Sequence, residues 1–416
     1  MRVILGFIFL TVLAWGGDAT IEVSKKVDSL PSIAVEDASV NYQDTTAKRF
    51  YRAIVSDLNV LSIFNVDRHY ATTHFNDEDV VFANKDFDYV LRFRLRQDDN
   101  GAFNVDMKLM QAQTIALEKT YRIKNENLYM FIAHTIAYDV NNQMGQAPVD
   151  WMKRKVILSR LSGAGKSEIL VTDYTLTYQH VMVKGGLNVF PKWSSEKQDA
   201  FYFTALDGTK PTLYRMDMRT GKNQKLLTSD GMLIVSDVSS DGQRLLLTMA
   251  PQGQADIYLY EVATGKYTRQ TKFGGIDVNG QFMDNDQIAF ISNRLGYPNV
   301  FTKKINSSSV EQLVYYGKSN SACSTHDEYI VYTARESSNA FSKNTFNLHL
   351  ISTKTDFIRR LTATGVNEFP RFSKDGDAIL FIKNYKNQSS IGVIRLEHNK
   401  NYLFPLKMGK IQSMDW

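Results

Sequence analysis

The 416-residue sequence has little of what several functional classes require. It contains one cysteine, Cys323, so no intrachain disulfide can form. After residue 14 no apolar run is long enough to cross a bilayer as a helix, so no membrane span is expected. Its seven histidines include no His-Glu-x-x-His pair and no metal-ligand cluster, so neither a metal nor a cofactor is predicted. Lysines and arginines form no basic stripe, and the net charge of +5 is modest, which argues against a nucleic-acid partner.

Catalytic motifs are also missing. Gly163-Ala164-Gly165-Lys166-Ser167 resembles the end of a phosphate-binding loop, but Arg160 stands where that motif needs its first glycine. The residues that follow are β-like rather than helical, so a hairpin turn is the better interpretation. No Gly-x-Ser-x-Gly nucleophile elbow occurs. The sequence therefore predicts a protein that is not an enzyme.

The chain begins like a secreted protein. Met1-Arg2 precedes an apolar run from Val3 to Ala14, and Gly17-Asp18-Ala19 provides small residues two positions apart. This pattern predicts a signal peptide over residues 1–19. A buried first strand or a short membrane anchor remains the alternative.

Residues 20–148 predict a small α/β domain. Short strand patterns at 20–24 and 32–35 precede an amphipathic helix from Thr45 to Phe64, with Asp44 or Thr45 as its N-cap. Alternation over 89–97 and 103–109, around an Asp-Asp-Asn-Gly turn, predicts a hairpin, which is followed by a strand and a helix. Three arginines alternate along its first strand. They favour a solvated sheet face over a recognition strip; they are Arg92, Arg94 and Arg96.

The rest of the chain is organised by a repeat. Asn188-Val189-Phe190-Pro191-Lys192-Trp193-Ser194 returns almost unchanged at 367–373. One anchor residue per repeat precedes a turn, at intervals of 41 to 49 residues; the anchors are Trp193, Val238, Phe282, Cys323, Phe372 and Trp416. Each anchor strand is followed by three more short strand patterns. This repeat length and this order of strand and turn patterns predict four-stranded blades of a β-propeller.

The ends of this region complement each other. Residues 155–183 contain three strand patterns without an anchor strand, whereas residues 411–416 form an anchor strand with nothing after it. Joining them yields one blade from both ends and removes the free sheet edges. We therefore predict a six-bladed propeller over residues 149–416, closed by its N- and C-terminal strands.

Polar and aromatic residues just before the anchors are expected to ring one mouth of the central channel. A concave, polar mouth could dock a protein loop or a small ligand. Alternatively, these groups only satisfy neighbouring strands and trapped water. The candidate residues are Asn188, Phe190, Val235, Asn279, Asn320, Glu368 and Phe369.

The repeats resemble those of the TolB family, the periplasmic component of the Tol-Pal envelope system. The residues that carry the resemblance are Asn188–Ser194, Ser239–Gly242, Asp256–Gly265 and Arg359–Thr362. The order of signal peptide, α/β domain and six-bladed propeller agrees as well. The resemblance is to an epsilon-type or otherwise divergent member, and the sequence departs from the family pattern at 284–286 and 325–327.

The resemblance implies a non-enzymatic, monomeric adaptor in the periplasm. Its propeller mouth would dock the peptidoglycan-associated lipoprotein Pal, and an arm at the start of the mature chain, Thr20, Ile21, Glu22 and Val23, would contact TolA. Outer-membrane proteins and bacteriocins are further implied partners. Such an adaptor maintains outer-membrane integrity, supports constriction at cell division and takes part in protein import. The alternative is an envelope enzyme or carbohydrate-binding propeller with its site in the channel.

Overall fold

The computed structural model describes residues 30–40, 42–77, 87–99, 101–112, 114–206, 208–336 and 344–416. The predicted signal peptide (1–19), the arm residues Thr20 to Val23 and the strand pattern at 20–24 lie outside these ranges. Residues Pro31–Trp416 form one compact unit. No helix in the described ranges is both long enough and apolar enough to span a bilayer.

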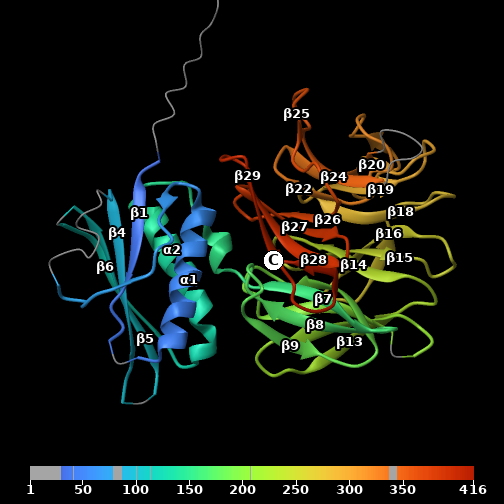
Figure 1. Ribbon diagram of the computed structural model, residues 1–416. Coiled ribbons are helices and arrows are strands. Elements are labelled where there is room, and N and C mark those ends of the chain that lie inside the picture. The colour runs from blue at the N-terminus through green and yellow to red at the C-terminus, as the bar shows by residue number, and fades with distance from the viewer. Residues whose placement is uncertain are drawn as a thin grey trace, which may run out of the picture. The chain divides into compact units, whose positions relative to one another are not determined.

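An α/β domain comes first. Its strands are β1 (Ser32–Asp37), β2 (Asn65–Val66), β3 (Ala71–Thr72), β4 (Tyr89–Gln97), β5 (Phe103–Gln111) and β6 (Thr114–Ile123). They form a sheet in the order β2-β1-β4-β5-β6, with β3 also paired to β1. The helices α1 (Asp44–Leu61) and α2 (Tyr129–Gln143) lie against one face of this sheet (Figure 1). A short 3-10 turn, η1 (Glu126–Leu128), precedes α2, and another, η2 (Asp150–Lys153), leads into the propeller.

The predicted helices and hairpin are present, with small differences at their ends. The apolar stripe of α1 is buried at Phe50, Ile54 and Leu58, as its three- to four-residue spacing requires. The helix begins one residue earlier than the predicted Thr45. Its N-cap is Gln43, whose side chain makes no cap hydrogen bond, so neither Asp44 nor Thr45 has the predicted capping role.

The arginine strip on β4 is not one solvated face. Arg92 is fully buried and forms an ion pair of 2.8 Å with the buried Glu36. Arg94 and Arg96 are partly exposed, and both bind Asp106 on β5. The prediction was wrong for Arg92 because β1 pairs with β4 and brings a carboxylate opposite it, a neighbour that alternation along one strand does not indicate.

The propeller is built from six four-stranded groups among the described residues, as predicted. The first three complete blades are β10 (Leu187–Trp193) to β13 (Asn223–Thr228), β14 (Leu233–Val238) to β17 (Tyr267–Arg269), and β18 (Asp277–Phe282) to β21 (Glu311–Gln312). Their middle strands are β11 (Ala200–Leu206), β12 (Thr212–Asp217), β15 (Arg244–Met249), β16 (Asp256–Glu261), β19 (Gln287–Ser292) and β20 (Asn299–Lys304).

Two further blades follow and are joined by one parallel pairing between β24 and β26. Their strands are β22 (Cys323–His326), β23 (Tyr329–Glu336), β24 (Thr345–Ser352), β25 (Ile358–Arg360), β26 (Val366–Phe372), β27 (Ala378–Tyr385), β28 (Gln388–Arg395) and β29 (Lys400–Pro405). Each blade is an antiparallel sheet whose first strand is innermost, since residues of these first strands line the central channel.

The sixth blade closes the ring. Its innermost strand, β30 (Lys410–Asp415), pairs with β7 (Val156–Gly163), and β8 (Lys166–Thr172) and β9 (Gln179–Val183) complete it. The glycine-rich segment at 163–167 is the β7–β8 hairpin turn, as interpreted from the sequence. Closure by the two ends of the propeller is therefore confirmed.

The anchor of the blade that begins with β22 is Thr325 rather than Cys323. In equivalent positions, the residue before the anchor accepts a hydrogen bond from the next anchor's backbone N–H: Asp415 from Trp193, and Ser324 from Phe372. Thr325 directly follows Ser324 and is therefore equivalent to the anchors of the other blades. With Thr325 as the anchor, the interval between repeats is also more regular. Cys323 is a buried core residue, and burial raises the pKa of its thiol to about 12.

A buried polar cluster joins α1 and α2 to the loop after β8. His134 lies between two carboxylates, with its Nδ1 2.8 Å from Asp57 and its Nε2 3.3 Å from Asp173. The Tyr174 hydroxyl donates to the other oxygen of Asp57 at 2.5 Å. All four side chains are fully buried. The α/β domain and the propeller are therefore linked by hydrogen bonds that water does not reach.

Candidate functional site

The central channel has an opening at each end of the innermost strands. The strand-start cavity has a volume of 330 Å³ and is lined by residues such as Phe190, Val235 and Phe369. The strand-end cavity has a volume of 490 Å³ and is lined by all six anchors, Thr325 included. Lys192 and Arg371 line both cavities, so a layer of side chains separates them.

The strand-start cavity is shaped by β-bulges. Pairing with the second strand of the blade is interrupted between Val189 and Lys192 on β10 and between Glu368 and Arg371 on β26. The Phe-Pro pairs of the repeated motif occupy these interruptions, where a proline needs no ladder hydrogen bond. Register shifts also occur in β14, β18 and β30. The bulges direct side chains toward the channel. Without a bulge, these side chains would alternate between the two faces of the sheet.

The bulges hold unusual backbone conformations. Phe190, Asn279 and Phe369 have φ angles of 53°, 54° and 51°. Left-handed conformations of residues other than glycine cost about 1–3 kcal/mol and persist where the surroundings determine them, often at ligand-binding positions. Three such residues around one cavity make it a candidate functional site.

Five of the seven residues predicted at the mouth line this cavity. They are Phe190, Val235, Asn279, Glu368 and Phe369. The two phenylalanine rings have centroids 6.4 Å apart and planes tilted by 46°. Glu368 is half-buried, and one of its oxygens accepts a 3.1 Å hydrogen bond from Asn384. The cavity thus offers two aromatic faces beside a carboxylate.

The other two predicted residues, Asn188 and Asn320, lie outside this lining. Asn188 is 3% exposed; its side chain donates to the backbone oxygens of Ser167 and Gly185. Asn320 is fully buried and donates to the side chain of Asn299 at 2.7 Å. These asparagines join their own blade to the preceding one, which is the structural alternative considered for polar groups near the mouth.

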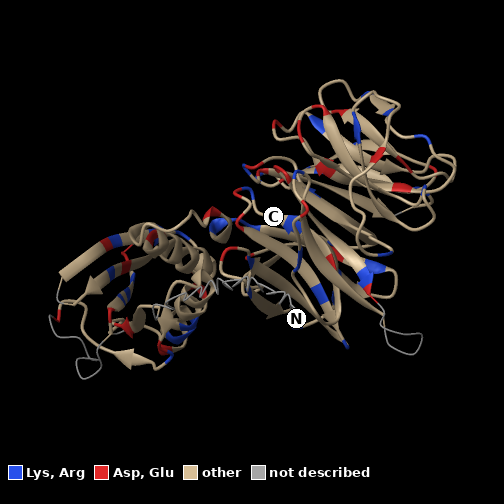
Figure 2. Ribbon diagram, turned by 90° about the horizontal axis from the view of Figure 1, so that it is seen from above, with Lys and Arg blue, Asp and Glu red and all other residues tan. Residues whose placement is uncertain are grey.

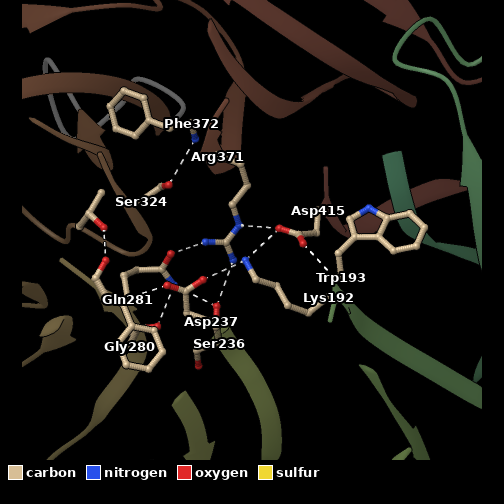
Figure 3. A network of polar contacts seen from close by, with 12 residues as sticks. Lys192, Trp193, Ser236, Asp237, Gly280, Gln281, Ser324, Arg371, Phe372 and Asp415 are labelled. Atoms are coloured by element: carbon tan, nitrogen blue, oxygen red, sulfur yellow. Dashed lines mark hydrogen bonds and ion pairs between the residues drawn. The ribbon is translucent and has the colours of Figure 1, made fainter. Parts of the chain in front are cut away.

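A ring of six polar residues lies between the cavities, one from each innermost strand (Figure 3). Each member directly precedes its blade's anchor; the central ring consists of Lys192, Asp237, Gln281, Ser324, Arg371 and Asp415. Lys192 forms ion pairs with Asp415 at 2.9 Å and Asp237 at 3.2 Å. Arg371 donates to Gln281 at 2.6 Å and lies 3.8 Å from Asp415.

Backbone groups complete the central ring. Trp193 N–H donates to Asp415 at 3.0 Å, and Phe282 N–H donates to Asp237 at 2.9 Å, so each carboxylate binds both a cation and the next blade (Figure 3). Two cations face two carboxylates, and all four side chains are at most 18% exposed. Such a paired network joins blades that are far apart in sequence.

Sequence reasoning missed the central ring, although a signal for it exists. The position before each corrected anchor is polar in every repeat, whereas an anchor at Cys323 places the apolar Ala322 there. The misplaced anchor therefore obscured the pattern.

Among the described residues, the central ring has no unpaired carboxylate of the kind that general acid–base catalysis uses. Its two central carboxylates, Asp237 and Asp415, are both ion-paired. No group of three or more His, Cys, Asp or Glu side chains in the described part of the chain is placed to hold a metal ion. What the geometry offers is a shaped cavity for binding.

Comparison of the sequence and the structure with known proteins shows the family of the chain. A family model described as the TolB beta propeller domain matches residues 156–416. The Tol-Pal system protein TolB of Wolinella succinogenes is 47% identical over 406 residues, which cover 96% of each chain. The chain belongs to the TolB family. This confirms the resemblance of the repeats, and the family is a non-enzymatic component of the Tol-Pal system, as predicted.

Other TolB proteins match over nearly the whole chain. That of Campylobacter jejuni strain RM1221 is 45% identical, covering 98% of both chains, and that of Helicobacter pylori strain 26695 is 36% identical, covering both completely. These relatives confirm the expected epsilon-type membership. The crystal structure of TolB from Acinetobacter baumannii has a TM-score of 0.75 at 18% identity, covering 93% of this chain and 97% of that one, and so supports the fold.

Proposed function

We propose that this TolB-family protein is a periplasmic adaptor whose strand-start cavity docks a segment of the lipoprotein Pal. In this role it helps to maintain the outer membrane and supports constriction during division. Membership in the family supports the system and the compartment. The cavity chemistry supports the place of docking.

The observation that carries the proposal is the aromatic pair beside Glu368. Phe190 and Phe369 present ring faces held in place by the bulged backbone, so little side-chain entropy is lost on binding. A partner loop with one apolar side chain and a polar or basic neighbour would fill 330 Å³ and meet the carboxylate. Central aromatic contacts of this kind commonly carry most of the binding energy at an interface.

The second partner, TolA, is proposed to contact the N-terminal arm. The arm residues Thr20, Ile21, Glu22 and Val23 precede β1, the first strand that the structure describes. This part of the proposal rests on the family resemblance. Two partners that share one adaptor could be coupled if the arm has different free energies in the two complexes. Outer-membrane proteins and bacteriocins remain proposed partners on the same basis.

The test is a calorimetric titration of the full chain with the soluble domain of Pal from the same organism. A one-to-one complex is expected. Phe369→Ala should raise Kd about 30-fold, since it removes a central aromatic contact worth about 2 kcal/mol. Glu368→Gln, which keeps the shape but removes the charge, should raise Kd about tenfold.

Glu196→Gln is the matched control. Glu196 lines the strand-end cavity, and its ion pair with Lys374 is exposed on both sides, so the change should leave both folding and Pal affinity unaltered. Equal weakening by Glu196→Gln and Glu368→Gln would contradict docking at the strand-start cavity. No binding by the unaltered chain would contradict the Pal assignment and favour a carbohydrate-binding role for the channel.

A further inference from the structure

A second polar cavity lies between two blades at the outer side of the propeller. The outer cavity has a volume of 490 Å³ and is lined by residues from the end of β17 and from β20 with its following loop. Four of its lining residues are basic: Arg269, Lys272, Arg294 and Lys303. Figure 2 shows basic and acidic residues interspersed over the propeller.

Two of the four cations are already neutralised. Arg269 forms an ion pair with Asp256, and Arg294 binds Asp277 at 3.0 Å; both carboxylates are fully buried. Arg294 also lies 5.2 to 5.3 Å from the ring centroids of Phe273, Phe290 and Phe301. These contacts hold the two guanidinium groups in fixed orientations. No carboxylate among the described residues forms an ion pair with the other two cations, Lys272 and Lys303.

Lys303 provides one of the unmatched charges. It is only 5% exposed, and the hydrogen bond described for its ammonium group is to the backbone oxygen of Gln270. A buried ammonium group has three donors and is costly without a counter-ion. Burial and the neighbouring Arg294 lower the pKa of Lys303, while Asp277 raises it. An incoming anion would supply the missing counter-charge.

The walls of the outer cavity are held in place by hydrogen bonds between its lining residues. The buried side chain of Gln270 bridges the two blades, accepting from Asn306 N–H at 2.9 Å and donating to its side-chain oxygen at 3.2 Å. Ser307 and Ser308 line the same space and add hydroxyl donors. The guanidinium groups with fixed orientations, the buried ammonium group and the hydroxyl groups are all hydrogen-bond donors. Together they suit a compact anion with several acceptor oxygens.

We propose that the outer cavity is a binding site for a phosphomonoester or pyrophosphate group. Such a group carries close to two negative charges near neutral pH, which matches the two unmatched cations, and its terminal phosphate has three acceptor oxygens. A carboxylate carries one charge and two oxygens and would leave one cation unpaired. The group can belong to a soluble metabolite or to a phosphorylated lipid headgroup.

The test uses the full chain and two probes at about 0.15 M ionic strength: soluble inorganic pyrophosphate, and vesicles of phosphatidylcholine with or without phosphatidate. Lys303→Met and Lys272→Gln are each expected to raise Kd at least tenfold. Lys272 is exposed, so its replacement spares the core if Lys303→Met impairs folding. Lys304→Gln is the matched control, because Lys304 is exposed, adjacent in sequence and outside the cavity lining.

Either probe can support the site. Binding of pyrophosphate that depends on Lys303 and Lys272 but not on Lys304 supports a soluble ligand. Phosphatidate-dependent vesicle binding with the same pattern supports a lipid headgroup. Equal loss with Lys304→Gln would indicate non-specific charge attraction and overturn the proposal, as would the absence of binding to both probes.

Discussion

The buried His134 cluster predicts an unusual dependence of stability on pH. Burial alone would lower the pKa of His134, but the carboxylates of Asp57 and Asp173 reverse this effect and raise the pKa to about 10. In the unfolded chain the pKa returns to about 6.5. The folded state therefore binds more protons than the unfolded state between these values, and its free energy of unfolding falls as pH rises.

The magnitude follows from proton linkage. The stabilisation from His134 is fully present below about pH 6.5, decreases by up to about 1.4 kcal/mol per pH unit, and is lost near pH 10, a total of about 5 kcal/mol. Asp173 acts in another range. Burial raises its pKa, His134 lowers it, and the net shift is downward, so its contribution is present above about pH 4 and is lost in acid. Asp173 therefore adds no slope between pH 7 and 9, where His134 supplies one.

The assay is urea unfolding at pH 7, 8 and 9, followed by both circular dichroism and tryptophan fluorescence. His134→Gln removes the charge and leaves two carboxylates facing each other in the interior, so we expect it to cost about 3–5 kcal/mol at pH 7. This deficit should shrink toward pH 9, because the proton that only the folded state holds on His134 stabilises the unaltered chain less as pH rises above the unfolded pKa.

His69→Gln is the matched control for this experiment. His69 lies 2.6 Å from Asp67, but its side chain is 76% exposed, so its loss should change stability little at any pH. A deficit of His134→Gln that stays constant from pH 7 to pH 9 would refute the reasoning. It would show that the buried imidazole is not charged in the folded protein.

Three further predictions concern the propeller. Lys192→Met leaves two central carboxylates without their shared cation and should lower the free energy of unfolding by about 3–5 kcal/mol, measured with urea at pH 7. A decrease below about 1 kcal/mol would contradict a coupled ring. Deleting residues 410–416 removes β30 and should lower the urea midpoint and expose β7 of the closing blade to proteolysis. An unchanged midpoint would contradict closure by this strand. Gly392→Ala would place a Cβ 2.2 Å from a buried phenylalanine ring and should lower Tm by several degrees, while Gly163→Ala, which meets nothing within 4 Å, should not.

Much of the fold could be predicted because it depends on local pattern. Strand patterns separated by turn pairs recur in every blade, and the unpaired strand at 411–416 indicated the closure. The Phe-Pro pair was visible as a motif, but its role as a bulge was not, since a bulge is defined by the register of the partner strand. Five of the seven residues proposed for the mouth line the strand-start cavity, whereas Asn188 and Asn320 do not, and their role in partner binding stays a prediction.

What could not be predicted depends on contacts between repeats. Cys323 was chosen as an anchor because it is apolar, yet the anchor position is defined by a hydrogen bond to the preceding blade, and a threonine satisfies it. Arg92 was assigned to solvent for a similar reason, because its partner Glu36 lies on a strand 56 residues away. In both cases the deciding neighbour is distant in sequence and polar, and polar neighbours leave no periodic signal.

The central ring shows how such neighbours bear on function. Its six members lie in six repeats, and each is unremarkable alone, but the fold places them where the two cavities would otherwise meet. Because both cations are paired, the ring adds little net charge to the strand-start cavity, and the carboxylate of Glu368 remains the charged group at the mouth. A ligand that enters from the strand-start side therefore meets aromatic rings and one carboxylate first, and a paired polar layer behind them. This arrangement favours a short inserted loop over a segment that threads the whole channel.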